Sequence, residues 1–459
     1  MMGDEKAGRE EWVSRLGFLL TMLGAMVGLG NIWRFPYVAG SNGGGAFLVA
    51  YVILLFLVAV PGLMGEAAMG RFAGAGATGT FRRMAGFSAP GIVVTLATFG
   101  IMTYYFPVIG WVLYYFGHAV VGTFFTAGFD SAVVWESFKS QPTLKLACHA
   151  AGVLLCGVPL YFGVSKGLER ASLVMVPAFF VALGVTAGRA LTLDGSSGGV
   201  AYLFTPDWTQ LTEPGVWLAA MGQVLFSTGL GWGIALTLGS YLSKSNDIPL
   251  GAGVFTALGD TSISLLAGLV VLPTVFAFGV DPTTGPELIF VSLPQLFPKM
   301  SAGYLWCLVF FTGFLFAGLT SGFAVMEVPV AVFQEESGLS RHQSVMWMMA
   351  AVWLLGLPSA LDFSFNELMD FVFGNWMLPL ATLATMLTLG WRFGAMKIRV
   401  LEVNYGADLY IGPWWDVAVR YLIPLSMASL LVWFTLDAFQ SQSAFRTLAG
   451  LGFVAGFLL

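Results

Sequence analysis

The stretch Gly24–Pro36, with the sequence GAMVGLGNIWRFP, constrains the fold of this chain most. It lies in an apolar run from Leu16 to Val60, which can cross a bilayer twice because one crossing needs ~20 residues. Glycine weakens a helix by ~1 kcal/mol and proline removes a hydrogen-bond donor, so we expect a helix that breaks in its middle. The freed peptide groups must be satisfied by protein, water or a ligand. A packing seam of small residues is the alternative, but it leaves Asn31 and Arg34 unexplained.

A second interrupted stretch, Gly222–Gly233, reads GQVLFSTGLGWG. Its GLGW at 229–232 matches GLGN at 28–31, roughly 200 residues earlier. Two Gly-interrupted apolar segments in corresponding halves are typical of secondary transporters whose site lies between two repeats.

The composition indicates a polytopic α-helical membrane protein. Of 459 residues, 57% are hydrophobic and 10% are charged, whereas soluble proteins average ~25% charged residues. The net charge of −5 comes without a basic cluster that would favour nucleic acid. Three cysteines without CxxC spacing and three histidines without an HExxH motif argue against a disulfide framework, a zinc site or a metal enzyme.

Hydropathy predicts eleven spans joined by short loops, and therefore one transporter domain over 1–459. The predicted spans are 15–38, 45–70, 91–127, 145–163, 171–190, 215–242, 249–279, 302–334, 344–358, 366–390 and 416–436. The stretch 443–459 is short for a span, so a twelfth helix stays open. The bias of Lys and Arg predicts a cytoplasmic N-terminus with 1–14 as a cytoplasmic segment, followed by an uncleaved first span.

Polar side chains inside predicted spans are candidate site residues. They are Asn31, Ser227, Asp260, Thr320 and Ser321. A lone Ser or Thr is more often bonded to its own helix, but an aspartate at mid-span needs a cation or a proton. Carboxylate, amide and hydroxyl oxygens suit a hard cation, and a broken helix adds free carbonyls and N–H groups. Such a site can hold Na⁺ together with a zwitterion.

Long motifs along the chain then resemble the neurotransmitter:sodium symporter family, and most closely its bacterial transporters of leucine and other hydrophobic amino acids. The motifs are GAMVGLGNIWRFPY, NGGGAF, SKGLER, GVWLAAMGQVLFSTGLGWG and FAGLTSGFAVMEVPVAVF. The resemblance runs from about Arg9 to Pro413. Transporters of this family are among the known examples in which two interrupted helices form the binding site. It implies two inverted five-helix repeats, here 15–190 and 215–393, with C-terminal helices in 414–459.

The resemblance also implies the ligands of two sodium ions. The first site would use the carbonyl of Met26, the side chains of Asn31, Ser227 and Asp260, and the substrate carboxylate. The second would use the carbonyls of Gly24, Val27 and Ala317 and the hydroxyls of Thr320 and Ser321.

The substrate would lie between the two broken helices, according to the same resemblance. Its carboxylate would meet the N–H groups of Leu29 and Gly30 and the hydroxyl of Tyr105, and its amine the carbonyls around Met26, Phe226 and Ser227. The side-chain pocket would be shaped by Ile101, Tyr105, Phe226, Gly229, Trp232, Ser321 and Val325. Gly28 stands where amine transporters of the family carry an aspartate, which favours an amino acid over a monoamine.

Two gates follow from the resemblance. Arg34 with Asp370 resembles the outer gate, although two separately solvated charges are the alternative. Arg9 with Glu335 resembles the inner gate, with a glutamate in place of the usual aspartate. The segment 281–299, expected as two short pieces broken by Pro294, resembles the outer lid.

Chloride is not expected, although Tyr51, Gln223, Ser227 and Ser264 match the chloride-binding positions of other members. Asp260 replaces a neutral asparagine there and would repel the anion.

These features predict a sodium-coupled symporter for a neutral, hydrophobic amino acid in a plasma membrane, and more narrowly a bacterial inner membrane. An ion channel, a symporter of another small zwitterion or amine, and an intramembrane enzyme are the alternatives. No nucleophile–base pair supports the enzyme. The sequence leaves open the exact amino acid, the number of sodium ions, proton antiport and the oligomeric state.

Overall fold

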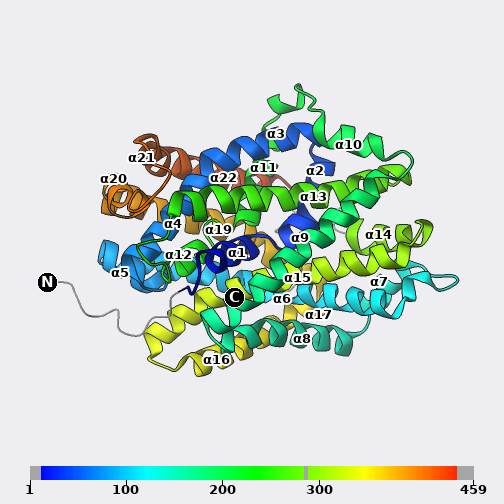
Figure 1. Cartoon of the computed structure of the whole chain (residues 1–459), viewed down its shortest axis with the longest axis horizontal. Coiled ribbons are helices and arrows are strands. Elements are labelled where there is room, and N and C mark those ends of the chain that lie inside the picture. The colour runs from blue at the N-terminus through cyan, green and yellow to red at the C-terminus, as the bar shows by residue number, and fades with distance from the viewer. Residues whose placement is uncertain (1–11, 284–287, 442–459) are drawn as a thin grey trace.

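The computed structural model describes residues 12–283 and 288–441 and is all-helical over these residues (Figure 1). Within them, eight helices are long and apolar enough to cross a membrane, and a ninth span forms if one bent pair is counted. The protein is therefore an all-α polytopic membrane protein.

The long spans combine α-helices with π-helical turns (η). They are Gly45–Ala73 (α3, η2, α4), Ala89–Val121 (α6), Pro142–Tyr161 (α8), Val164–Leu191 (η4, α9), Pro249–Ala277 (η6, α13), Gly303–Ser337 (α15), Phe363–Val403 (α18 to η11) and Trp414–Leu436 (α21, η12, α22). Within the seventh span, η9 covers Asp370–Met377 and η11 covers Arg399–Val403.

The first predicted span is broken, as the glycines indicate. Helix α1 (Arg15–Met26) ends before η1 (Gly30–Arg34) and α2 (Phe35–Ser41), and the two halves are bent by 49°. Proline lies at the second position of α2, where its missing N–H costs little.

The predicted span 215–242 is broken too. Helix α11 (Pro214–Thr228) and the short α12 (Ile234–Gly239) flank the GLGWG link. Gly231 in this link has φ of +85°, and a Cβ there would lie 2.1 Å from Oγ1 of Thr382. Both the backbone conformation and the space therefore require glycine.

The remaining predicted spans are found as helices with shifted bounds. The span 344–358 appears as α16 (Arg341–Leu355), and the span 366–390 continues to Val403. The stretch 443–459, for which a twelfth helix was left open, lies outside the described residues. Pro294 does not break the outer loop as expected. It is the second residue of α14 (Leu293–Leu296), which follows η7 (Leu288–Ser292) directly and precedes the 3₁₀ turn η8 (Phe297–Lys299). Proline is accepted there because it fits the first turn of an α-helix.

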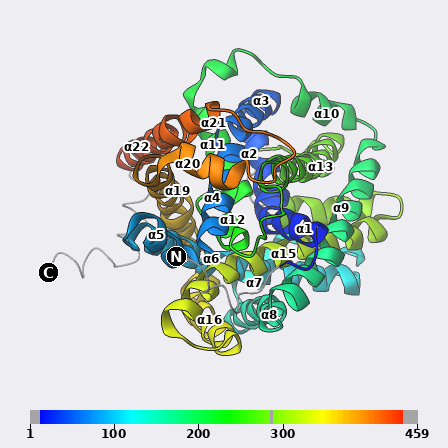
Figure 2. The ribbon, with the colours of Figure 1, turned by 60° about the vertical axis from the view of Figure 1, so that its left-hand side comes forward.

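The broken helices lie inside the bundle. Helix α1 packs against α9, α13 and α15, and α12 packs against α4 and α15 (Figure 2). This arrangement surrounds both breaks with protein, where freed backbone groups can be satisfied.

Candidate functional site

The two helix breaks line one small cavity that is nearly filled by its own side chains. Its lining consists of Ala25, Met26, Gly28, Gly30, Tyr105, Phe226, Ser227, Gly229, Trp232, Ile234, Ser321 and Val325. All the predicted substrate residues except Leu29 and Ile101 belong to this lining. Leu29 instead donates its N–H to the hydroxyl of Tyr105 (3.3 Å), and Ile101 is fully buried.

Sequence reasoning missed Ala25 and Ile234. Both adjoin a break: Ala25 precedes Met26 in the last turn of α1, and Ile234 begins α12 directly after GLGWG. Their position beside the interrupted stretches was the available signal.

A fully buried polar cluster surrounds Asp260 of α13 beside the first break. Asn31 directs its Nδ2 to Oδ1 of Asp260 (2.6 Å) and to Oγ of Ser264 (2.9 Å). Tyr51 and Ser227 both donate to Oδ2 of Asp260, at 2.9 and 3.0 Å. Four segments far apart in the sequence thus meet at one carboxylate.

Asp260 has no cationic partner among the described side chains. Its exposed fraction is 0%, and its side-chain donors are one amide and two hydroxyls. A buried carboxylate is strongly disfavoured unless a positive charge or a proton compensates it. The cluster therefore requires either a bound cation or protonation of Asp260.

Asn31 is oriented with its nitrogen toward Asp260. Its Oδ1 accepts the N–H of Gly28 at 3.0 Å. Asn31 therefore presents its amide hydrogens, and not its oxygen, to the carboxylate of Asp260.

The predicted second cation site also comes together. The hydroxyl of Ser321 on α15 reaches across the first break and donates to the carbonyls of Val27 (2.9 Å) and Gly24 (3.2 Å). Thr320 donates to the carbonyl of Ala317 at 3.1 Å on its own helix, as the simpler interpretation of a lone threonine expects. All five predicted ligands lie within this small region.

Gly28 leaves no room for a side chain. A Cβ at this position would lie 2.4 Å from Oγ of Ser321 and 2.7 Å from the hydroxyl of Tyr105. A larger residue here would require both side chains to shift, so Gly28 keeps this corner of the cavity free of a protein side chain.

Arg34 lies against Phe226, one of the residues that line the cavity. Its guanidinium donates to Oε1 of Gln223 at 3.0 Å and lies 5.2 Å from the ring centre of Phe226. Gln223 in turn donates to the carbonyl of Gly30 at 2.9 Å. Asp370 is close enough to interact electrostatically with Arg34, but the two side chains form no direct ion pair.

Arg9 lies outside the described residues, so the Arg9–Glu335 pair is not described. Glu335 accepts the N–H of Gly76 at 2.7 Å. Trp12 donates its indole N–H to the carbonyl of Leu238 (3.2 Å), which attaches the start of the described chain to α12.

A buried network that sequence reasoning missed lies between α12, α15 and α16. Tyr241 donates to Oε1 of Glu327 at 2.6 Å, and Arg341 donates to both oxygens of Glu327 at 3.0 and 2.8 Å.

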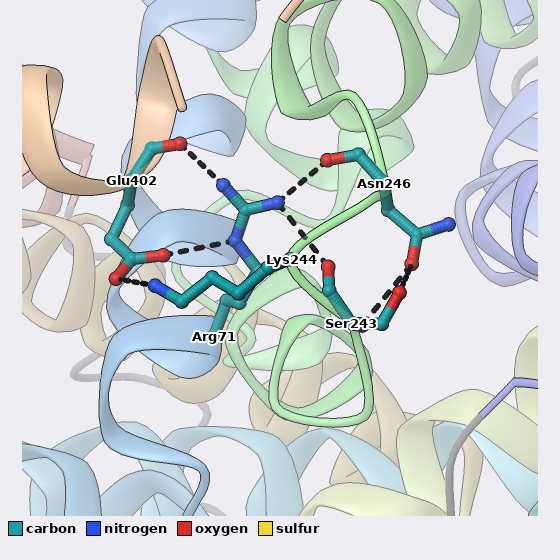
Figure 3. Close-up of polar contacts among 5 residues, drawn as sticks. All are labelled: Arg71, Ser243, Lys244, Asn246 and Glu402. Atoms are coloured by element: carbon teal, nitrogen blue, oxygen red, sulfur yellow. Dashed lines mark hydrogen bonds and ion pairs between the residues drawn. The ribbon is translucent and has the colours of Figure 1, made fainter. Parts of the chain in front are cut away.

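A second missed network surrounds Arg71 of α4 (Figure 3). Its Nε donates to Oε2 of Glu402 at 2.9 Å, and its terminal nitrogens contact the carbonyls of Asn246 (2.6 Å), Ser243 (3.5 Å) and Glu402. Lys244 forms an ion pair with the other oxygen of Glu402. The network joins α4 and the connection after α12 to the end of the Phe363–Val403 span.

No group of three or more His, Cys, Asp or Glu side chains gathers as a metal site within the described residues. The oxygen-rich, single-carboxylate cluster at Asp260 instead suits a hard monovalent cation.

Comparisons with known proteins agree with this chemistry. The chain matches the model of the sodium:neurotransmitter symporter family over residues 9–127 and 134–447. A relative described as the uncharacterized sodium-dependent transporter YhdH of Bacillus subtilis (strain 168) is 32% identical over 442 residues, 91% of this chain and 96% of that protein. The sodium-dependent serotonin transporter of Drosophila melanogaster is 30% identical over 404 residues, 76% of this chain and 64% of that protein.

A solved structure is similar over nearly its whole length. The crystal structure of MhsT in complex with L-phenylalanine has a TM-score of 0.85 and 35% identity, and covers 93% of this chain and 99% of that chain. This protein is therefore a multi-pass, sodium-dependent membrane transporter of a small molecule and not an enzyme. It belongs to the sodium:neurotransmitter symporter family.

Proposed function

We propose that this protein takes up a neutral amino acid with a largely hydrophobic side chain by sodium symport. The observation that carries the proposal is the fully buried Asp260, which has only neutral donors and lies beside a cavity lined by both broken helices. A cation at this carboxylate would also bind the carboxylate of a zwitterion in the cavity.

The first sodium ion would bind Asp260, Ser227, the turned amide of Asn31 and the carbonyl of Met26. The second sodium ion would bind the carbonyls of Gly24, Val27 and Ala317 and the hydroxyls of Thr320 and Ser321. Its binding would break the hydrogen bonds that Ser321 now donates. Support comes from the distances between these groups, since the Ser321 hydroxyl already lies within 3.2 Å of two of the carbonyls.

The substrate carboxylate would bind at the start of η1, where N–H groups of Leu29 and Gly30 carry partial positive charge. The crowding at Gly28 supports an amino acid over a monoamine, because a monoamine transporter would need a carboxylate on the protein there. The apolar walls formed by Phe226, Ile234 and Val325 favour a hydrophobic side chain. MhsT, whose structure contains L-phenylalanine, is consistent with this class.

Transport would proceed by alternating access between the inverted repeats 15–190 and 215–393, with helices of 414–459 at the periphery. Arg34 and Asp370 would close the outer side and Arg9 and Glu335 the inner side. The protein would lie in a bacterial inner membrane with a cytoplasmic N-terminus, as the Lys and Arg bias predicts. Bound chloride would not be needed, because Asp260 supplies the negative charge.

The test is uptake of labelled amino acids into proteoliposomes with and without an inward sodium gradient. We expect uptake of leucine or phenylalanine to be concentrative and to need the gradient. Gradient-independent flux, or current far above stoichiometric uptake, would instead favour an ion channel. Glycine competing better than both leucine and tryptophan would contradict the hydrophobic substrate class.

A further inference from the structure

The wall of the cavity contains one polar side-chain group that the protein leaves without a partner. Trp232 is 3% exposed, and its indole Nε1 has no hydrogen-bond acceptor. The other polar side chains of the described lining are engaged: Tyr105 accepts the N–H of Leu29, and the hydroxyls of Ser227 and Ser321 donate to neighbouring oxygens.

The indole of Trp232 is also held in place. The ring packs edge-to-face on Phe226 (centroids 5.4 Å apart, 78°) and on Tyr105 (6.5 Å, 90°). The backbone N–H of Trp232 donates to the carbonyl of Gly229 at 3.2 Å, and its carbonyl accepts from Thr98. Because ring and backbone are both fixed, the N–H cannot readily turn to find a partner elsewhere.

A buried indole N–H normally finds an acceptor, and leaving it without one costs free energy. Because Trp232 lines the cavity, a ligand bound there is the available source of an acceptor. Under the proposed function, the carboxylate and amine of an amino acid are bound at the helix breaks, so the remaining acceptor belongs to the substrate side chain.

We propose that Trp232 is a specificity-determining residue whose indole N–H binds an acceptor on the substrate side chain. The transporter would then discriminate within the neutral amino acids, and a side chain with a hydroxyl or thioether would gain relative to an apolar side chain of the same shape. This inference rests on the proposed function and refines its substrate class to a largely apolar side chain that carries one hydrogen-bond acceptor.

The experiment compares isosteric pairs in competition binding at saturating sodium: threonine with valine, and methionine with norleucine. Absolute preference is not diagnostic, because a hydroxyl also costs desolvation. For each protein, the affinity for threonine is divided by the affinity for valine. The diagnostic quantity is this ratio in the wild type divided by the same ratio in Trp232→Phe. The phenylalanine keeps an aromatic ring but has no N–H, and its smaller volume affects both members of a pair alike.

We expect this quotient to be about three- to tenfold, the contribution of one hydrogen bond. The matched control is Trp376→Phe on η9, because Trp376 also has a buried indole N–H without a partner but lies outside the cavity lining. Its ratio should equal that of the wild type. An unchanged ratio in Trp232→Phe, or an equal change in Trp376→Phe, would overturn the inference.

A second measurement needs only the wild type and covers the case that Trp232→Phe does not fold. Threonine and allo-threonine have the same groups but exchange the positions of hydroxyl and methyl. A fixed donor should separate their affinities by at least about threefold, and equal affinities would count against it. If the wild type binds no neutral amino acid at all, the proposed function fails; if it binds them without these differences, only the role of Trp232 fails.

Discussion

Asp260 and Glu402 are both buried carboxylates, yet the protein treats them in opposite ways. Glu402 has a side-chain exposure of 3% and two cations, Arg71 at 2.9 Å and Lys244. Asp260 is buried beside neutral donors alone. Both positions are deep enough that a lone negative charge is costly.

The difference separates a structural charge from a functional one. Where α4, the connection after α12 and η11 meet, the protein pairs Glu402 with its own cations. Backbone carbonyls accept the remaining hydrogen bonds of Arg71 (Figure 3). Beside the helix break the protein omits such cations, which leaves the proposed sodium ion as the partner of Asp260. Among the residues that the structure describes, Glu66 is also buried without a protein cation and accepts the N–H of Gly231, so the missing cation supports a sodium site at Asp260 only together with the amide and hydroxyl groups gathered there.

The largest expected effect is on stability and concerns Arg71. Arg71→Met leaves Glu402 with only the half-exposed Lys244, and removing one partner of a buried ion pair costs about 3–5 kcal/mol. We expect the melting temperature of the purified protein in detergent to fall by about 5–10 °C. The double variant Arg71→Met/Glu402→Leu should recover part of this loss. A single variant that melts like the wild type would show that the pair is not structural.

The next effect concerns sodium affinity. Asp260→Asn removes a negative charge ~4 Å from the proposed ion. At an effective dielectric near 20 the lost Coulomb energy is on the order of 4 kcal/mol. The amide oxygen of the asparagine would restore part of it. We expect the sodium concentration for half-maximal substrate binding to rise about a hundredfold. Glu402→Gln is the matched control, because it removes an equally buried charge away from the cavity and should leave the sodium dependence unchanged. If both variants behave alike, the distinction between the two carboxylates is wrong.

Sodium should also stabilise the wild type selectively. At a sodium concentration one hundred times the dissociation constant, binding contributes about 2.7 kcal/mol to the free energy of unfolding. We expect sodium, but not potassium, to raise the melting temperature of the wild type and of Glu402→Gln, and to have little effect on Asp260→Asn. Equal stabilisation of all three proteins would place the dominant sodium site away from Asp260.

The smallest effect is the response to chloride. Replacing chloride by gluconate should leave sodium-driven uptake by the wild type unchanged, because the fixed carboxylate would repel a second anion. Tyr51, Ser227 and Ser264 gather at this position, so Asp260→Asn should transport weakly and improve when chloride is present. Wild-type uptake that stops in gluconate would show that the carboxylate does not replace the anion.

The helices and their breaks were predictable because they depend on local chemistry. Apolar runs of sufficient length mark the spans, and glycines at 28, 30, 229 and 231 mark both interruptions. Asp260 was identifiable as a site residue because an aspartate at mid-span has few explanations other than function.

The pairings were not predictable from local pattern. Arg71 and Glu402 are 331 positions apart, and no local pattern in the sequence connects them. The orientation of Asn31, the Gln223 contact of Arg34 and the unpartnered indole of Trp232 depend on how side chains pack at the centre of the bundle. The family resemblance indicated which residues lie together, whereas the hydrogen bonds among them are seen only in the three-dimensional structure.

The charge of Asp260 also has a consequence for the return of the unloaded transporter. After sodium leaves, an ionised Asp260 would carry one negative charge back across the membrane, and an inside-negative potential favours this movement by about 2.3 kcal/mol per charge and 100 mV. If a proton replaces sodium, the return is electrically silent and exports that proton. Net uptake should therefore depend on voltage or on internal pH even at saturating sodium, while exchange of internal for external substrate, in which the site never crosses without sodium, should not depend on internal pH. Net uptake insensitive to both would show that the empty protein crosses back with another cation bound.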